Sequence, residues 1–182
     1  MEIREQGPEH FGEHGKIPIT IWGNSRLDID ALRQNEIREV PCDKFVKDYD
    51  DFDDQRPVNL PYRFDVDPWV LLTAYDVAGH RVGGVLIARD TYLPDQSTDL
   101  GVLVDIRVRP DLTRKGAGRA LIQAAREWAQ KNGLKKLQAE TQDTNVGACR
   151  FYQATGFTVE SVEEGAYQPD LDEAKVIWTL NV

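Results

Sequence analysis

The chain has 182 residues, long enough for one substantial hydrophobic core and too short to make two ordinary domains the default. Its 31 Asp and Glu against 22 Lys and Arg give a formal net charge of -9, which disfavours nucleic-acid binding because no broad basic stripe is available. No apolar run approaches the roughly 20 residues of a membrane helix, and residues 1–5 lack the apolar region of a signal peptide. We therefore expect one mixed α/β domain over residues 1–182, located in the cytoplasm.

The first part of the chain gives weak signals for secondary structure. Residues 1–16 are polar and contain glycine without any periodicity, so we expect a loosely ordered lead-in. Residues 17–22 are compatible with a strand, and residues 27–40 fit a helix or a strand equally. Pro57, Pro61 and Pro68 favour extended pieces in the next stretch.

The middle of the chain is predicted to form strands. Residues 69–75 and 81–88 are apolar runs joined by a turn-forming segment, which predicts an antiparallel hairpin. Residues 93–99 indicate a polar turn region. The β-branched run 102–108 predicts a further strand, which ends before Pro110.

The segment 113–119, Thr-Arg-Lys-Gly-Ala-Gly-Arg, lies between that strand and an amphipathic helix predicted to end near residues 132–133. Gly116 and Gly118 let main-chain N–H groups approach a ligand, and the helix N-terminus adds partial positive charge. This pattern predicts a site for a phosphate-rich cofactor. Lys115 precedes its glycine, which excludes a Walker loop, and Leu121 excludes a dinucleotide fingerprint. A glycine-containing connection flanked by solvated basic residues is the alternative.

The last part predicts a strand at 137–141, a helix at 145–154 and two paired strands at 158–162 and 176–180. Asn145 is suited to cap the start of the helix, and Gly156 to end it.

Several of these segments together resemble one enzyme superfamily. They are residues 140–152, Glu-Thr-Gln-Asp-Thr-Asn-Val-Gly-Ala-Cys-Arg-Phe-Tyr, the pair Gly156-Phe157, the run 105–108, Asp-Ile-Arg-Val, and the glycine loop. In this order they resemble the GNAT superfamily of acyl-CoA-dependent N-acetyltransferases over about the last hundred residues. Within this superfamily, the sequence of residues 140–152 most resembles the streptothricin acetyltransferase-like proteins, which acetylate an amine of an antibiotic.

The resemblance implies the GNAT acyl-CoA N-acyltransferase fold, a mixed and mostly antiparallel sheet flanked by helices, with acetyl-CoA as cosubstrate and no metal. The main chain of Ile106, Arg107 and Val108 is implied to bind the amides of the pantetheine arm as an added strand. The implied contacts to the rest of the cofactor come from Arg114, Lys115, Gly116, Ala117, Gly118, Arg119 and Asn145. Family members commonly carry Arg or Gln where this chain has Thr113, and Arg114 is the candidate substitute.

Acetyl transfer to an amine needs a neutral nucleophile and a proton for the departing thiolate. The resemblance assigns the proton donor to Tyr152. A buried core tyrosine is the alternative, although Phe151 beside it can serve the core instead. For the base, Asp105 and Glu140 are candidates, whereas Val104 stands where similar antibiotic-modifying enzymes carry a carboxylate. The alternative for each carboxylate is an ion pair, with Arg107 or Lys136 respectively.

Acidic residues gather in one segment of the chain. The members of this group are Asp43, Asp48, Asp50, Asp51, Asp53 and Asp54. They indicate either a solvated acidic loop or a rim that attracts a cationic amine.

Histidine and cysteine give no sign of a metal site. His10 and His14 have helical spacing but no third ligand nearby, so we expect incidental surface histidines. Cys42 and Cys149 are expected to be reduced, with Cys149 filling the inner face of its helix as a small hydrophobe.

The sequence therefore predicts an N-acetyltransferase that moves an acetyl group from acetyl-CoA to a primary amine of a small molecule, by direct attack in a ternary complex. The alternatives are a CoA-binding regulatory module without turnover and an acetyltransferase acting on protein amines. Because the family often dimerises, a homodimer is also an expectation.

Overall fold

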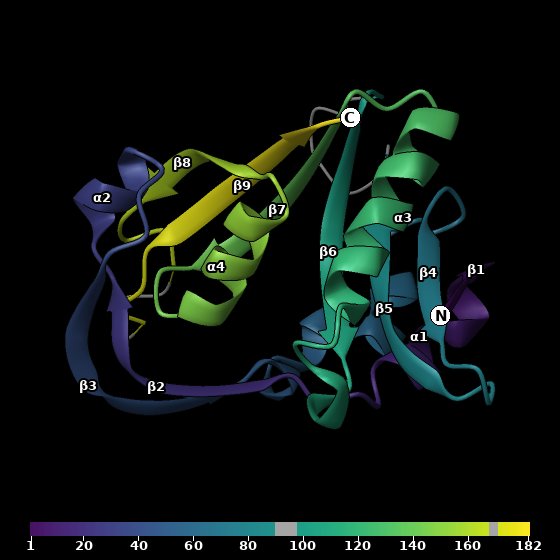
Figure 1. Ribbon diagram of the computed structural model, residues 1–182, viewed down its shortest axis with the longest axis horizontal. Coiled ribbons are helices and arrows are strands. Elements are labelled where there is room, and N and C mark those ends of the chain that lie inside the picture. The colour runs from purple at the N-terminus through teal and green to yellow at the C-terminus, as the bar shows by residue number, and fades with distance from the viewer. Residues whose placement is uncertain (90–97, 168–170) are drawn as a thin grey trace. The chain divides into compact units, whose positions relative to one another are not determined.

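The computed structural model describes residues 1–89, 98–167 and 171–182 and divides the chain into two compact units (Figure 1). The first unit comprises residues 1–19, 48–137 and 182, and the second comprises residues 20–47 and 138–181. The polar turn predicted at 93–99 lies mostly outside the described residues.

The first unit is built on four strands in the order β1 (Glu2–Gln6), β4 (Val70–Tyr75), β5 (Arg81–Ala88) and β6 (Leu100–Val108), and each neighbouring pair is antiparallel. The predicted hairpin of β4 and β5 is confirmed. Its turn is closed by Asp76, whose Oδ1 accepts hydrogen bonds from the main-chain N–H groups of Ala78 and His80 at 2.8 and 2.9 Å.

Both faces of this sheet are covered. Helix α3 (Ala117–Lys131) packs on β4, β5 and β6, as Figure 1 shows. A hydrophobic cluster forms on Leu71 and Leu86 of the sheet and includes Phe11, Leu60 and Trp69 from other segments. Because β5 is buried on both sides, its sequence is a continuous apolar run rather than an alternating one.

The N-terminal segment is ordered, so the expectation of a loose lead-in over residues 1–16 is wrong. Strand β1 pairs with β4 and is followed by the 3₁₀ helix η1 (Pro8–His10) and the short helix α1 (Phe11–His14). Phe11 is 1% exposed and His14 is fully buried. Polar side chains dominate β1 because most of its residues are exposed, and this composition conceals the strand in the sequence.

The proline-rich stretch forms 3₁₀ helices instead of the expected extended pieces. They are η2 (Tyr49–Asp51), η3 (Asp53–Gln55) and η4 (Pro57–Tyr62). Pro57 occupies the first helical position of η4, where its fixed φ and missing N–H are tolerated.

The predicted strand at 102–108 is confirmed as β6. The pairing with β5 shifts register between Leu86 and Ile87, because β6 has one extra residue, Val104, between the partners Leu103 and Asp105. After β6, the 3₁₀ helix η5 (Pro110–Leu112) leads into the glycine loop and α3.

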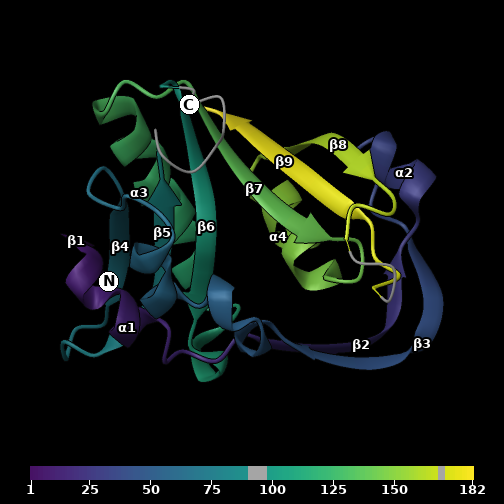
Figure 2. The ribbon, with the colours of Figure 1, turned by 180° about the vertical axis from the view of Figure 1, so that it is seen from behind.

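The second unit contains most of β7 (Lys136–Gln142) together with β9 (Lys175–Asn181) and β8 (Thr158–Glu163), and β9 lies between the other two (Figure 2). Strands β8 and β9 are antiparallel, which confirms the predicted pairing. The predicted helix at 145–154 is confirmed as α4 (Val146–Ala154), and Gly156 beyond its end has a φ of 95°. The short helix α2 (Ile29–Arg33) contacts β8.

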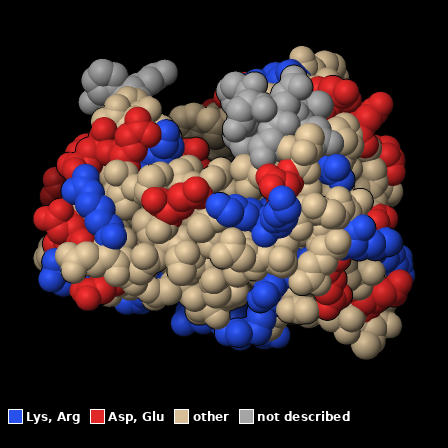
Figure 3. All heavy atoms as spheres, turned by 90° about the horizontal axis from the view of Figure 1, so that it is seen from above, with Lys and Arg blue, Asp and Glu red and all other residues tan. Residues whose placement is uncertain are grey.

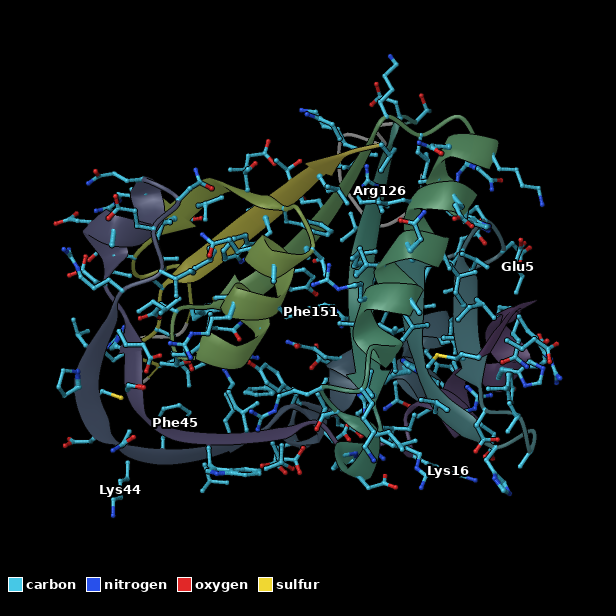
Figure 4. The ribbon with its side chains drawn as sticks, in the orientation of Figure 1. Glu5, Lys16, Lys44, Phe45, Arg126 and Phe151 are labelled. Carbon is cyan, nitrogen blue, oxygen red and sulfur yellow. The ribbon has the colours of Figure 1, made fainter. Side chains whose placement is uncertain are left out.

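A separate two-stranded sheet in this unit consists of β2 (Thr20–Leu27) and β3 (Glu39–Asp48). The strand expected at 17–22 therefore lies further along the chain, and the ambiguous segment 27–40 holds both α2 and the start of β3. Lys44 and Phe45 project from opposite sides of β3 in Figure 4, and Phe45 lies against Gly23 of β2.

The surface carries charges of both signs. On the face shown in Figure 3, Lys and Arg side chains are interspersed with Asp and Glu. No helix in the described parts of the chain is long and apolar enough to cross a membrane.

Candidate active site

The glycine loop begins α3 in an unusual backbone conformation. Arg114 and Gly116 have φ values of 58° and 91°, both in the left-handed region. Gly116 is the residue that precedes the first turn of α3, and no side chain caps that turn. A Cβ added at Gly116 would meet no heavy atom within 4 Å, so the space beside this residue is open.

The start of α3 combines hydrogen-bond donors with positive charge, and both favour binding of an anion. The first N–H groups of a helix have no acceptor within the helix, and here they belong to Ala117, Gly118 and Arg119. Arg114, Lys115 and Arg119 are exposed. Among the residues that the structure describes, none of these three cations pairs with a carboxylate, whereas the nearby Arg109 pairs with Asp111 at 2.8 Å. The arrangement fits a phosphate group.

The strand predicted to bind the pantetheine arm contains a buried arginine. Ile106 and Val108 are half-buried, and Arg107 between them is 3% exposed. The Arg107 guanidinium donates to both oxygens of Asp50 at 2.8 and 2.9 Å and to the carbonyl oxygens of Gly15 and Ile17 at 3.1 and 2.9 Å. Its side chain therefore holds three chain segments together.

Asp105 belongs to the same network. Its carboxylate accepts three hydrogen bonds from Arg107 at 2.9 to 3.0 Å, so the ion pair considered for this residue is present. Its Oδ1 also lies 2.8 Å from Nε2 of His14. Burial alone would raise the pKa of Asp105, but the hydrogen bonds and charges of His14 and Arg107 outweigh burial and lower it.

His14 is not the surface histidine expected from the sequence. It is fully buried, and its Nδ1 has no hydrogen-bond partner among the described residues. Gly84 on β5 leaves room for the ring, because a Cβ there would lie 2.9 Å from Nδ1. The sequence carried one faint signal, since Phe11 and His14 are three residues apart and share a face of a short helix.

Tyr152 lies in the second unit, on the inner face of α4. It is 4% exposed, and its ring centroid lies 5.1 Å from that of Phe157 and 6.3 Å from that of Trp178. Phe151, labelled in Figure 4, is only half-buried. The expectation that Phe151 would fill the core in place of Tyr152 is therefore wrong, because Cys149 and Tyr152, at i and i+3, form the buried face.

Glu140 projects from β7 and is exposed. Its Oε1 accepts a hydrogen bond of 2.8 Å from the Tyr167 hydroxyl, so the partner considered from the sequence, Lys136, is replaced by a neutral phenol. The Tyr167 oxygen in turn accepts from Gln142 Nε2 at 2.8 Å. Sequence reasoning missed Tyr167, which lies 27 residues from Glu140 and follows no motif.

Asn145 acts as the predicted cap of α4. Its Oδ1 accepts from the main-chain N–H of Ala148 at 3.1 Å. Cys149 is fully buried as expected, and burial raises its pKa to about 11. Both cysteines are free thiols.

The acidic group is partly neutralised by nearby residues. Asp50 pairs with Arg107, Asp54 pairs with Arg63 at 3.0 Å, and Asp48 accepts from the main-chain N–H of Asp50 at 3.0 Å. Much of this charge is thus committed to contacts within the chain.

The sequence and the fold were compared with known proteins. The family described as the Acetyltransferase (GNAT) family matches residues 32–157. Streptothricin acetyltransferase A of Bacillus subtilis (strain 168) is 38% identical over 79 residues, which are 42% of this chain and 46% of that protein. The ribosomal protein bS18-alanine N-acetyltransferase of Escherichia coli (strain K12) is 32% identical over 86 residues, 46% of this chain and 57% of that protein. The chain thus spans about half the length of these curated relatives.

Solved structures match over nearly the whole chain. A Bacillus anthracis (strain Ames) protein assigned as a streptothricin acetyltransferase, in complex with acetyl coenzyme A, has a TM-score of 0.76 at 22% identity and covers 100% of this chain and 98% of that one. Nourseothricin acetyltransferase has a TM-score of 0.73 at 21% identity, over 99% of this chain and 97% of that one. These matches confirm the predicted fold, and the chain belongs to the GNAT acetyltransferase family.

Proposed function

We propose that this chain transfers an acetyl group from acetyl-CoA to a primary amine of a small molecule, by direct attack of the amine on the thioester in a ternary complex. The observation that carries the proposal is the start of α3. There, N–H groups without helical acceptors lie among three cations that have no carboxylate partner in the described chain. Such a site suits the pyrophosphate of CoA.

The chain's own residues supply the binding steps. The N–H groups of residues 116–119 and the side chains of Arg114, Lys115 and Arg119 would hold the pyrophosphate. The main chain of Ile106, Arg107 and Val108 would bind the amides of the pantetheine arm. The buried network around Arg107 supports this role, because it fixes the position of the strand without using the main-chain groups.

For the base we propose Glu140 rather than Asp105. Both oxygens of Asp105 accept hydrogen bonds from Arg107, and its side chain is only 8% exposed. A carboxylate held in this way is a poor proton acceptor, because protonation would break charge-assisted bonds. Glu140 is exposed, and it accepts a hydrogen bond from a neutral group, the Tyr167 hydroxyl. Asp105 then acts as a positioning residue for β6.

For the acid we propose Tyr152, on the family resemblance. The phenol would donate its proton to the sulfur of the departing CoA thiolate. The resemblance places this tyrosine seven residues after an asparagine, and Asn145 holds the cap position of α4. Glu140 would accept the proton that the ammonium group must lose before the neutral amine attacks. The nitrogen loses its second proton as the amide forms, which balances the proton that Tyr152 gives to the thiolate.

Streptothricin-type antibiotics are the acceptors we propose first. The support is the 38% identity over 79 residues to streptothricin acetyltransferase A of Bacillus subtilis. The test is release of free thiol from acetyl-CoA, with and without streptothricin-type antibiotics and simple diamines. Release that depends on the amine supports the proposal, and CoA binding without any release favours the regulatory module.

A protein amine is the second candidate acceptor. The identity to a ribosomal protein alanine N-acetyltransferase, 32% over 86 residues, favours it. A peptide with an N-terminal alanine in the same thiol assay separates the two. A homodimer and a cytoplasmic location stay predictions from the sequence.

A further inference from the structure

The Tyr167 hydroxyl connects two side chains of β7. It donates to Oε1 of Glu140 and accepts from Nε2 of Gln142, each at 2.8 Å. A carboxylate can only accept, so the single phenol proton must point to Glu140, and the amide of Gln142 must supply the other hydrogen bond. The side chain of Gln142 therefore fixes the direction of the Tyr167 hydroxyl.

Glu140 lacks the ion pairs that two other acidic side chains of the second unit form. Fully buried Asp143 pairs with Arg26 at 2.5 Å, and Glu173 pairs with Lys47 at 2.6 Å while accepting from Thr144. Glu140 forms no ion pair within the described parts of the chain, and its recorded partner uses Oε1. Like Glu160, whose Oε2 accepts from Nε2 of Gln138 at 3.1 Å, Glu140 has a negative charge that no described cation neutralises, and the hydrogen bond from Tyr167 distinguishes Glu140.

Tyr167 itself is a poor candidate for a base. Burial raises its pKa above the usual value, and the neighbouring charges of Glu140 and Glu173 raise it further, although the hydrogen bond from Gln142 acts in the opposite direction. The phenol is therefore protonated near neutral pH, and toward Glu140 it acts as a donor.

We propose that Tyr167 is a positioning residue for amine recognition: it binds Oε1 of Glu140 and leaves Oε2 to receive the ammonium group and then the proton of the acceptor. This inference rests on the proposed function. It also specifies the group of the acceptor that binds Glu140: a primary amine that arrives as a cation and loses one proton to the carboxylate. The proton passes from the nitrogen to Oε2 of Glu140, and Tyr167 keeps its own proton throughout.

The test is the pH profile of kcat/KM for the amine in Tyr167→Phe. Phenylalanine keeps the ring and removes the hydrogen bond that favours the charged carboxylate. Without this bond Tyr167 no longer holds the carboxylate in one orientation toward the amine, so kcat/KM for the amine should fall by about 10-fold. We expect KM for acetyl-CoA to stay unchanged, because the residues proposed to bind CoA are left as they are.

Two further variants separate positioning from loss of structure. Glu140→Gln should lower kcat/KM for the amine by more than Tyr167→Phe does, and adding Tyr167→Phe to it should have no further effect, because Tyr167 acts through Glu140. Tyr62→Phe changes a tyrosine that is 87% exposed and should leave the profile unchanged. Thermal unfolding of each variant reports on the fold.

The outcomes distinguish this inference from the proposed function. If wild type turns over an amine and Tyr167→Phe keeps the wild-type kcat/KM for it at every pH, the positioning role is wrong and the enzyme activity stands. An additional loss on adding Tyr167→Phe to Glu140→Gln would also overturn it. If no amine drives CoA release from wild type, the proposed function fails, and this inference fails with it.

Discussion

His14 Nε2 lies 2.8 Å from Oδ1 of Asp105, although the two residues are 91 positions apart, and both side chains are buried. The contact attaches the N-terminal segment to β6. Arg107 adds hydrogen bonds to the carbonyl groups of Gly15 and Ile17, so the same segment is held at two points.

Replacing His14 should destabilise the first unit. His14→Ala leaves a cavity beside Gly84 and removes a hydrogen bond to a buried carboxylate, which together cost about 2 to 4 kcal/mol in the free energy of unfolding. Urea denaturation measures this value. His10→Ala is the matched control, because His10 is partly exposed and its substitution should cost less than about 0.5 kcal/mol. Equal costs for the two variants would show that the contact is unimportant.

Asp105→Asn should change how stability depends on pH. The pKa of Asp105 is lowered in the folded chain, so its contribution is present above the ordinary value of 3.8 and disappears as the pH falls through the folded value. At pH 7 the variant should be less stable by roughly 3 kcal/mol, and the difference should shrink below about pH 4. Denaturation curves at several pH values check this.

Asp30→Asn is the control for that experiment, because the side chain of Asp30 is 81% exposed and pairs with Arg33 at the surface. It should lie close to wild type at every pH. A constant difference between Asp105→Asn and wild type down to pH 2 would contradict the assigned role of the carboxylate.

The two thiols should differ in reactivity. Burial raises the pKa of Cys149 to about 11, whereas Cys42 is partly exposed. At pH 8 the folded chain should therefore react with a thiol reagent at one cysteine, and at both after unfolding in urea. Rapid labelling of Cys149 in the folded chain would mean that the core around α4 is open.

Tyr152→Phe should lower kcat by about 10- to 1000-fold while the affinity for CoA is kept. Loss of the proton donor slows departure of the thiolate, and the ring still fills its place beside Phe157 and Trp178. Steady-state kinetics with a leaving thiol of lower pKa should restore part of the rate. Unchanged kcat would assign Tyr152 to the core alone.

The sequence predicted the fold best where local pattern and burial agree. The hairpin of β4 and β5, the strand β6 and the helices α3 and α4 each have a clear apolar pattern. It failed for residues 1–16 and for η4. In β1 the exposed residues hide the strand, and in η4 the prolines favour a 3₁₀ turn as readily as an extended chain.

The candidate site divides in the same way. The glycine loop and the cap at Asn145 follow from local chemistry, so the sequence was sufficient to find them. His14 and Tyr167 were missed because each depends on a partner 91 or 27 residues away, and no local pattern reports such a contact. For Asp105 the sequence allowed two roles, a catalytic base or an ion pair with Arg107, because residues two apart on a strand lie on the same face.

The central claim is that the start of α3 binds CoA, and calorimetric titration of CoA into wild type, Gly116→Ala and Gly79→Ala tests it. Both glycines have a positive φ and open space around a Cβ, so the two substitutions should cost similar stability, about 1 kcal/mol. We expect wild type and Gly79→Ala to bind CoA equally and Gly116→Ala to bind at least about 10-fold more weakly, because its methyl group occupies the space assigned to the pyrophosphate. No heat from wild type at millimolar CoA, or equal affinity in all three proteins, would contradict the account.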